Sequence, residues 1–250
     1  MKESCSVIWT EEVDSTNNEA LGHSDCTDGM SVWAASFQTA GRGQRGNVWI
    51  SSRGENLTFS ILVRFGSGAI GTLRALRQFA VSLAVTLGIT DYLSSRGIEA
   101  SIKWPNDIWV EDRKICGILV ENRICGEMIS RSIIGIGLNV NQKEFPLELP
   151  NPTSMSILTG SPYDPKAELE DLVPYLSARL RNLDSDESLQ AEYESRLYRR
   201  GVLSEYSDNT LGGIVFKGTI TGVSPFGKLR IETNEGELKE FAFKEISFVI

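Results

Sequence analysis

A glycine- and arginine-rich segment is a candidate for binding an anion. Residues 38–47 read QTAGRGQRGN, with three glycines around Arg42 and Arg45. Glycine lets backbone N–H groups converge on one point, and guanidinium groups donate paired hydrogen bonds to anions. The segment does not match the GxxxxGK[ST] pattern of a Walker phosphate loop. A ligand-binding loop and a flexible surface loop therefore explain it about equally well.

Two further segments combine a lysine with residues that disturb a regular strand. Residues 103–107 read KWPND, and a proline within a strand predicts an edge or a bulge, where Asn106 can bond a ligand or close a turn. Residues 114–121 read KICGILVE, an apolar strand whose glycine permits close approach of a ligand or another backbone. If the turn between them centres on Asp112, Lys114 and Asn106 lie on the same face of a hairpin. Taken alone, each segment is more commonly an ordinary strand end.

Two polar segments complete the set. Residues 15–17 read STN, and Thr16 with Glu19 matches a capping box, which predicts that a helix begins here. Hydroxyl and amide groups beside a helix N-terminus can also hold a polar ligand. Residues 135–141 read GIGLNVN, which lacks the third glycine of a dinucleotide fingerprint and a clear following helix. Local structure alone explains both segments.

The composition is that of an ordinary globular protein. The chain has 250 residues and a formal net charge of -8, which argues against broad binding to nucleic acid or to anionic membranes. No apolar run approaches the roughly 20 residues that span a bilayer, and the first residues lack the apolar core of a signal peptide. Four scattered cysteines without a CxxC pair, and one histidine, argue against a zinc site and indicate reduced thiols. We therefore predict no metal ligands in the protein, no membrane partner and a cytoplasmic location.

The elements that position these segments alternate between strands and helices. Helices are predicted from residue 16 onward and at 70–94, 165–183 and 188–200. Strands are predicted at 6–11, 31–38, 56–65, 101–110, 114–122 and 128–141. Near the end, short strands are predicted at 218–223, 228–233 and 237–243, separated by PFG and NEG turns. The fold class is α+β, with a mixed or antiparallel sheet flanked by helices over 1–205 and a small β-meander or barrel over 206–250.

Taken together, the five segments closely resemble those of the biotin protein ligases, in the form without a DNA-binding domain. The resemblance rests on the order and gaps of the motifs, of which GRGxRG and KWPND are the most diagnostic, and it covers the whole chain. It implies an AMP-forming ligase that uses ATP and Mg²⁺ to activate biotin as biotinyl-5′-AMP. Biotin would then pass to a lysine of a biotin carboxyl carrier protein domain of a biotin-dependent carboxylase. The implied fold is a class II synthetase-like catalytic domain with a C-terminal SH3-like β-barrel.

The resemblance also implies roles for individual residues. The ureido ring of biotin would be bound by Ser15, Thr16, Asn17 and Gln38. A loop that closes over biotin and the adenylate would contain Arg42, Gly43, Gln44 and Arg45. The nucleotide would lie among Lys103, Trp104, Asn106, Ile118 and Asn139. Lys114 would contact the biotin carboxylate and the α-phosphate, with Gly117 beside biotin, and Lys114 and Arg42 would be the catalytic cations.

The chain departs from the family pattern, and two other functions compete with this interpretation. The family loop often reads GRGRRGR, whereas Gln44 and Asn47 here replace two arginines and lower its positive charge. Only 14 residues precede Ser15, too few for a helix-turn-helix, so we expect no specific DNA binding. The competing functions are a lipoate ligase of related fold and an inactive biotin-binding protein. KWPND and GRGQRG favour biotin over lipoate, and retention of Arg42, Lys114 and Asn139 argues for activity. A homodimer is left open.

Overall fold

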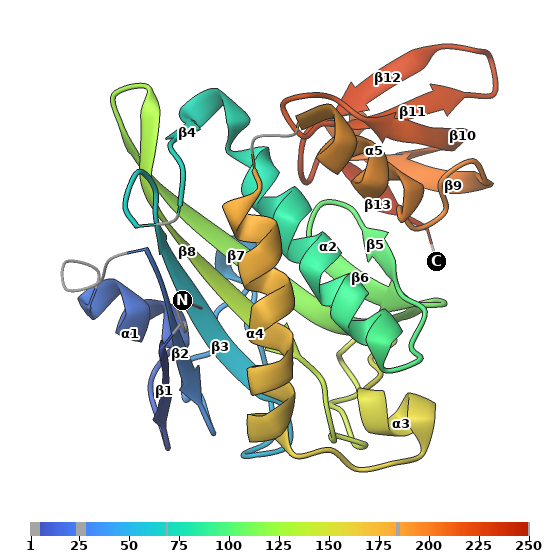
Figure 1. Ribbon diagram of the computed structural model, residues 1–250. Helices are drawn as coiled ribbons and strands as arrows, with labels where there is room; N and C mark the ends of the chain where they lie inside the picture. The colour runs from blue at the N-terminus through green and yellow to red at the C-terminus, as the bar shows by residue number, and fades with distance from the viewer. Residues whose placement is uncertain (1–5, 24–28, 69, 184–185, 250) are drawn as a thin grey trace.

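The larger of two sheets is mixed, with the strand order β1-β2-β3-β8-β7-β6-β5 and β4 paired to β8 (Figure 1). The computed structural model describes residues 6–23, 29–68, 70–183 and 186–249. Within that part, β1 and β2 pair in parallel, and the other neighbours in this sheet are antiparallel. The strands are β1 (Ser6–Thr10), β2 (Met30–Ala35), β3 (Leu57–Arg64), β4 (Leu73–Arg74), β5 (Ser101–Lys103), β6 (Asp107–Val110), β7 (Arg113–Cys125) and β8 (Met128–Leu138). The prediction of a mixed or antiparallel sheet is confirmed in its mixed form.

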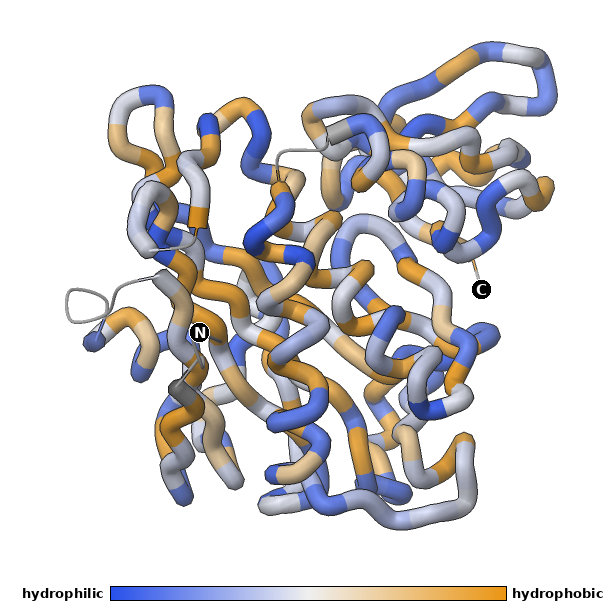
Figure 2. The backbone as a smooth tube through the Cα atoms, in the orientation of Figure 1, coloured by the Kyte–Doolittle hydropathy of each residue, from blue (hydrophilic) through white to orange (hydrophobic). Residues whose placement is uncertain are grey.

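Helices cover both faces of this sheet. Helices α2 (Phe79–Ser95) and α4 (Pro165–Arg181) pack together on one face (Figure 1). Because side chains alternate across a strand, neighbouring positions of β2, β3 and β8 divide between two apolar clusters. The smaller cluster packs against α1 (Thr16–Gly22) and consists of Ala20, Trp33, Leu62 and Ile133. Helix α1 therefore lies on the face opposite α2 and α4, and the central strands between them are strongly hydrophobic (Figure 2).

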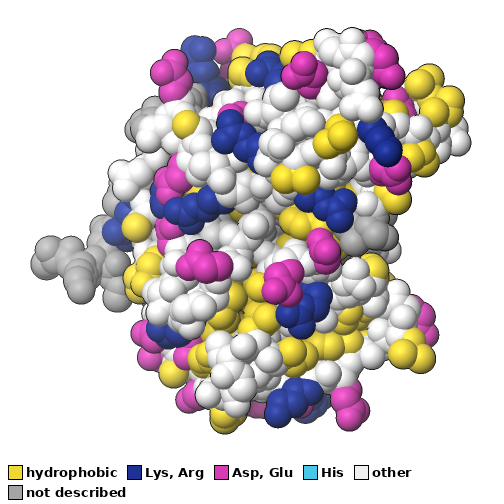
Figure 3. All heavy atoms as spheres, turned by 90° about the vertical axis from the view of Figure 1, so that its right-hand side faces the viewer, with side chains coloured by type: hydrophobic (Ala, Val, Ile, Leu, Met, Phe, Trp, Pro, Cys, Tyr) yellow, Lys and Arg dark blue, Asp and Glu magenta, His cyan; other side chains and the backbone are white. Residues whose placement is uncertain are grey.

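The surface carries mixed charges. Seen from the right-hand side of Figure 1, basic and acidic side chains are interspersed with apolar ones (Figure 3).

Two shorter helices lie outside the central layer, α3 (Met155–Thr159) and α5 (Asp186–Ser195). Among the described residues, no helix has the length and apolar character needed to cross a membrane.

The predicted long helix at 70–94 is wrong in its first third. Residues Leu73–Arg74 form strand β4, and the α-helix begins only at Phe79. Leu73 pairs with Ile129 of β8 and is buried, whereas Leu76, three residues later, is 70% exposed. The helical spacing of these leucines was coincidental, because pairing with β8 uses the backbone groups that a helix would need.

The predicted strand at 101–110 is two strands. Strands β5 and β6 pair antiparallel and are joined by a turn that contains Trp104, Pro105 and Asn106. The Trp104–Pro105 peptide is cis, and Pro105 lies in the turn rather than in mid-strand as predicted. The next turn, between β6 and β7, includes Asp112 as expected, and a bulge in the β6–β7 pairing lies before it at Ile108 and Trp109. The hairpin therefore exists, but the KWPND segment forms its own sharp reversal.

The second sheet is antiparallel, with the order β12-β11-β10-β9-β13. Its strands within the described residues are β9 (Leu203–Asp208), β10 (Ile214–Val223), β11 (Leu229–Thr233), β12 (Leu238–Phe241) and β13 (Ile246–Phe248). Gly227 and Gly236 both have φ near +81°, which explains glycine in the two predicted turns. The predictions missed β9 and β13. Strand β9 begins at Leu203, near the predicted domain boundary between residues 205 and 206. That boundary stays a prediction.

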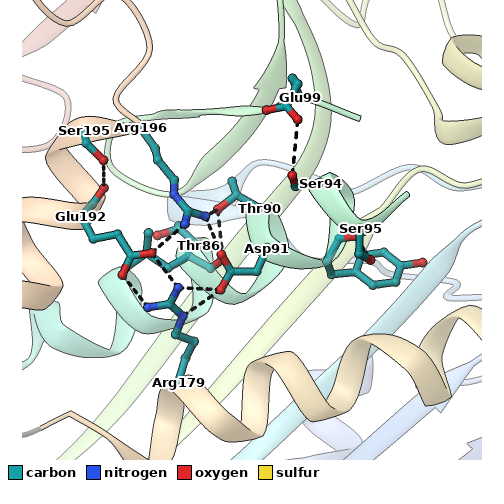
Figure 4. Close-up of polar contacts among 12 residues, drawn as sticks. Thr86, Thr90, Asp91, Ser94, Ser95, Glu99, Arg179, Glu192, Ser195 and Arg196 are labelled. Carbon is teal, nitrogen blue, oxygen red and sulfur yellow. Dashed lines mark hydrogen bonds and ion pairs between the residues drawn. The ribbon is translucent and has the colours of Figure 1, made fainter. Parts of the chain in front are cut away.

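A cluster of four charged side chains joins α2, α4 and the end of α5 (Figure 4). Arg179 contacts Asp91 at 2.6 Å and Glu192 at 2.6 Å. Arg196 contacts Asp91 at 2.7 Å and Glu192 at 2.6 Å. Helix α5 in turn reaches the second sheet, where Gln190 Nε2 donates to the Val223 carbonyl at 2.9 Å. The cluster thus fixes the helix that connects the two sheets.

Candidate active site

A cavity of about 620 Å³ opens on the sheet face that carries α1. Three parts of the molecule line it: the α1 N-terminus with the glycine-rich loop, strands β7 and β8 with the β5–β6 turn, and the edge of the second sheet. Predicted site residues that line it are Ser15, Thr16, Asn17, Gln38, Arg42, Gly43, Gln44, Lys103, Trp104, Asn106, Lys114, Gly117 and Ile118. The side chain of Arg45 lies outside the described part of the chain. The structure therefore brings most of the predicted set together.

A buried polar cluster forms the end of the cavity beside α1. Gln38 Oε1 accepts from Thr16 N at 2.8 Å and from Thr16 Oγ1 at 3.1 Å. Ser60 Oγ lies 2.7 Å from Thr16 Oγ1 and 2.6 Å from Asn17 Oδ1, and Asn17 Nδ2 donates to Glu121 at 2.7 Å. Thr16 and Asn17 are 4% and 3% exposed, so these bonds replace water. Hydroxyl and amide groups meet here in a neutral, hydrogen-bonding pocket.

The predicted capping box is wrong, although the helix does begin at Thr16. Ser15 is the N-cap residue, and its side chain makes no capping bond. The Thr16 hydroxyl is instead used by Gln38, 22 residues along the chain. The local pattern therefore located the helix and misidentified the partner of its hydroxyl.

Glu121 links this cluster to the glycine-rich loop. Arg42 Nη2 lies 2.5 Å from Glu121 Oε1, and Arg42 Nη1 donates to Asn18 at 3.1 Å. Sequence reasoning missed both Glu121 and Ser60. Glu121 was within reach of that reasoning, since it stands four positions after Gly117 and so shares its face of β7. Ser60, inside an apolar strand, gave no such signal.

Gly117 of β7 permits the close approach that was predicted for it. Gly135 and Gly137 of β8 permit it as well, and the approaching groups are side chains. Gly117 and Gly137 are paired across the strands, and the Trp49 indole lies on them. A Cβ at Gly137 would come within 2.1 Å of Trp49 Cε2, and one at Gly135 within 2.3 Å of Asn17 Oδ1. The Trp49 Nε1 is buried and has no hydrogen-bond partner within the described structure. Trp49 lies two residues after the glycine-rich segment, and no role was predicted for it.

Two lysines stand further along the cavity in different surroundings. Lys114 Nζ lies 2.8 Å from Asp107 Oδ2. Lys103 Nζ lies over the Trp109 ring, 3.8 Å from its centroid, and 5.0 Å from the centroid of Phe248. Burial among these rings lowers the pKa of Lys103 to about 8. Lys103 is therefore a partly desolvated cation that an anionic ligand would stabilise.

The β5–β6 turn ties the first sheet to the second. Trp104 Nε1 donates to the Gly227 carbonyl at 2.9 Å, and its ring meets Phe243 edge to face. Asn106 Nδ2 donates to the Ile118 carbonyl. Asn139 does not line the cavity: it is 4% exposed and its Nδ2 donates to the Thr153 carbonyl at 2.9 Å. The structure thus gives Trp104 and Asn106 places at the cavity and gives Asn139 a structural bond beside it.

The second sheet contributes lining residues that the sequence did not predict. They include Asn209, Phe243, Lys244, Ser247 and Phe248. Asn209 Nδ2 donates to the Lys244 carbonyl at 2.8 Å and to Ser247 Oγ at 3.0 Å. The cavity is therefore completed by residues more than 190 positions along the chain from its α1 end.

Comparisons with known proteins agree with this architecture. The Biotin/lipoate A/B protein ligase family matches residues 9–139, and the Biotin protein ligase C terminal domain matches residues 209–249. A bifunctional ligase/repressor BirA of Bacillus subtilis is 32% identical over 94% of this chain and 72% of that protein. A biotin–[acetyl-CoA-carboxylase] ligase of Paracoccus denitrificans is 32% identical over 69% of this chain and 72% of that protein.

A solved structure shares the whole fold. The biotin protein ligase of Aquifex aeolicus in complex with biotin and ATP superposes with a TM-score of 0.77 at 29% identity, covering 98% of each chain. The sequence match extends over more than half of the chain and the structural match over nearly all of it. This chain therefore belongs to the biotin/lipoate A/B protein ligase family.

Proposed function

We propose that this protein activates biotin with ATP to form biotinyl-5′-AMP and then transfers biotin to a lysine of a biotin carboxyl carrier protein domain. The observation that carries the proposal is the arrangement of one cavity, in which a neutral polar cluster and two lysines lie in succession. Relatives support it, because the Aquifex structure holds biotin and ATP and the Paracoccus protein is a biotin–[acetyl-CoA-carboxylase] ligase.

The polar cluster suits the ureido ring of biotin. That ring carries one carbonyl and two N–H groups, so its site must offer both acceptors and donors. Thr16, Asn17 and Gln38 offer both, with Ser60 and Glu121 holding Asn17. We assign Ser15 to the same site. The dithiolane ring of lipoate has no comparable hydrogen-bonding groups, so it could not exchange hydrogen bonds with this cluster as the ureido ring can. The cluster therefore favours biotin over lipoate.

The first step joins two anions. A biotin carboxylate oxygen attacks the α-phosphorus of ATP, an O–P bond forms, and the bond to pyrophosphate breaks. Fixed cations must hold the carboxylate beside the phosphate and stabilise the charge of the transition state. We assign this role to Lys114 and Arg42, with Gly117 beside biotin and Lys103, Trp104, Asn106 and Ile118 around the nucleotide. In the second step a carrier lysine amine attacks the acyl carbonyl, which yields an amide and AMP.

The glycine-rich loop is assigned the role of a lid. Biotinyl-5′-AMP is a mixed anhydride, so water must be excluded from it. The ion pair between Arg42 and Glu121 holds the loop to the sheet beside the polar cluster. Gly43 and Gln44 belong to the same loop, as does Arg45. Because an adenylate phosphate would compete with Glu121 for Arg42, closure of the loop would depend on the ligand.

Mg²⁺ is expected to enter with ATP. In such sites the ion keeps several waters and is held by substrate phosphates with one or two carboxylates. Asp107 is the one carboxylate among the described residues that line the cavity, and its position beside Lys114 fits that limited role. A bound Mg²⁺ would neutralise the leaving pyrophosphate. A cytoplasmic location and the absence of specific DNA binding stay predictions.

A direct test is incubation of the protein with ATP, Mg²⁺ and either biotin or lipoate, followed by mass spectrometry of the acyl-adenylate. We expect biotinyl-5′-AMP and no lipoyl-AMP, then a covalent mass increase on an added carrier domain. Lipoyl-AMP as the main product would replace the proposal with a lipoate ligase. Biotin binding without any adenylate would indicate the inactive biotin-binding protein.

A further inference from the structure

We propose that Lys244, on the second sheet, binds the β- and γ-phosphates of ATP and then the leaving pyrophosphate. The inference rests on the proposed function and extends it to a residue outside the motifs. Lys244 lies in the turn between β12 and β13 and lines the cavity. No ion pair joins it to a carboxylate in the parts of the chain that the structure describes. Its ammonium group is thus available to an anionic ligand.

The backbone at Lys244 is held in an unfavourable conformation. Its φ is +73°, in the left-handed region that lysine rarely adopts. Three bonds fix the turn: Asn209 Nδ2 to the Lys244 carbonyl at 2.8 Å, Ala242 N to Glu245 Oε2 at 2.7 Å, and Glu245 N to the Ala242 carbonyl at 3.0 Å. Glycine would fit this turn without strain. A strained lysine that faces a ligand cavity indicates a role for the side chain rather than for the backbone.

The order of charges along the cavity identifies the ligand group. The proposed function places Lys114, together with Arg42, at the reacting carboxylate and α-phosphate. Beyond it stands Lys103, which packs on Phe248 of the second sheet, and Ser247 next to Phe248 also lines the cavity. Lys244 adds a further positive charge on this side. A chain of cations that continues past the α-phosphate matches a triphosphate, whose charge is spread over successive phosphates.

The test compares variants of Lys244 for ATP and for biotin. Lys244→Gly removes the amine and relieves the strain, so we expect the KM for ATP and the inhibition constant of pyrophosphate to rise about tenfold. The Kd of biotin should stay unchanged, and the melting temperature should stay equal or rise. Lys244→Asn should give the same changes as Lys244→Gly, because asparagine also tolerates the left-handed backbone conformation. Lys244→Arg should keep most of the ATP affinity.

Glu111→Gly is the matched control, because Glu111 also has a positive φ of 53° but lies outside the cavity. It should leave both substrates unaffected. An unchanged KM for ATP in Lys244→Gly and Lys244→Asn would overturn the assignment. A rise confined to the KM of the carrier domain would also overturn it and would place Lys244 in the carrier contact. Wild-type protein that forms no biotinyl-5′-AMP would refute the proposed function instead, which separates the two failures.

Discussion

The two ends of the cavity are built on different principles. Near Asn17, the polar side chains bond to one another and are already satisfied without a ligand. Near Lys103, the cation rests on aromatic rings, and burial has lowered its pKa to about 8. The first end is thus arranged in advance to exchange hydrogen bonds with a neutral ring. The second end holds positive charge in an environment that favours binding of an anion.

The ends also differ in how they are assembled. The polar end is formed by the first sheet and its adjoining helix and loop. The other end needs both sheets in contact, which the Trp104–Gly227 bond and the packing of Gly227 on Phe79 secure. A Cβ at Gly227 would come within 2.5 Å of the Phe79 ring. Changes at the interface of the sheets should therefore affect the nucleotide more than biotin.

The largest effect is expected between the two ends, at Lys114. Lys114→Ala should slow adenylation by roughly 10²- to 10³-fold, the cost of losing one preorganised charge stabiliser. Biotin affinity should fall much less, since the ureido contacts remain. Rates from single-turnover formation of biotinyl-5′-AMP and Kd values from calorimetry check this. Near-normal adenylation in the variant would remove Lys114 from the catalytic role.

The next effect is at the polar end. Asn17→Ala leaves Glu121 and Ser60 without their shared partner, so the Kd of biotin should rise roughly 10- to 100-fold. The KM for ATP, measured at saturating biotin, should be nearly unchanged. Asn18→Ala is the control, because Asn18 adjoins Asn17 but its side chain is exposed and bonds to Asp14 and Arg42. Equal losses in both variants would contradict the assignment of the ureido ring to this cluster.

The sequence predicted the sheet from local patterns of apolar residues. It predicted most of the cavity only through the resemblance of five segments to one family, since the segments around Gly117 and Lys114 are, taken alone, more commonly ordinary strand ends. The long helix failed because Leu73 satisfies a helical spacing while its backbone pairs with β8. Periodicity in one segment cannot reveal a competing partner that lies more than 50 residues away.

The missed residues have contacts that no local pattern encodes. Ser60 and Glu121 meet through Asn17, from strands far apart in the chain. Lys244 is an ordinary turn lysine in sequence, and only the docking of the second sheet places it in the cavity. Asn139 shows the converse: the family resemblance implied a nucleotide contact, but its Nδ2 donates to the Thr153 carbonyl. Local chemistry thus predicts which segments matter better than it predicts what each side chain contacts.

A smaller effect should follow from the charge cluster of Figure 4. Arg179→Ala leaves Asp91 and Glu192 with Arg196 alone, and its side chain is only 25% exposed. We expect the free energy of unfolding to fall by roughly 1–3 kcal/mol, less than for a fully buried pair because water screens the charges. Looser docking of α5, which connects the two sheets, should raise the KM for ATP about threefold. The Kd of biotin should stay unchanged. Denaturant unfolding and steady-state kinetics check both. Parallel losses for the two substrates would show that the cluster supports the fold as a whole.

The smallest effect concerns pH and Lys103. Because burial lowers its pKa to about 8, the amine loses its charge as pH rises through that value. The kcat/KM for ATP should therefore fall above pH 8, roughly threefold by pH 9, as a charge-assisted bond to phosphate is lost.

The contribution of Lys103 to the free energy of unfolding should move in the opposite direction. In the unfolded chain the same amine keeps its proton up to about pH 10.5, its ordinary pKa. Between these values the unfolded state binds more protons, so the contribution of Lys103 to stability rises with pH. Lys103→Arg keeps its charge throughout and should flatten the kinetic fall. A fall of equal size in that variant would assign the pH dependence to another group.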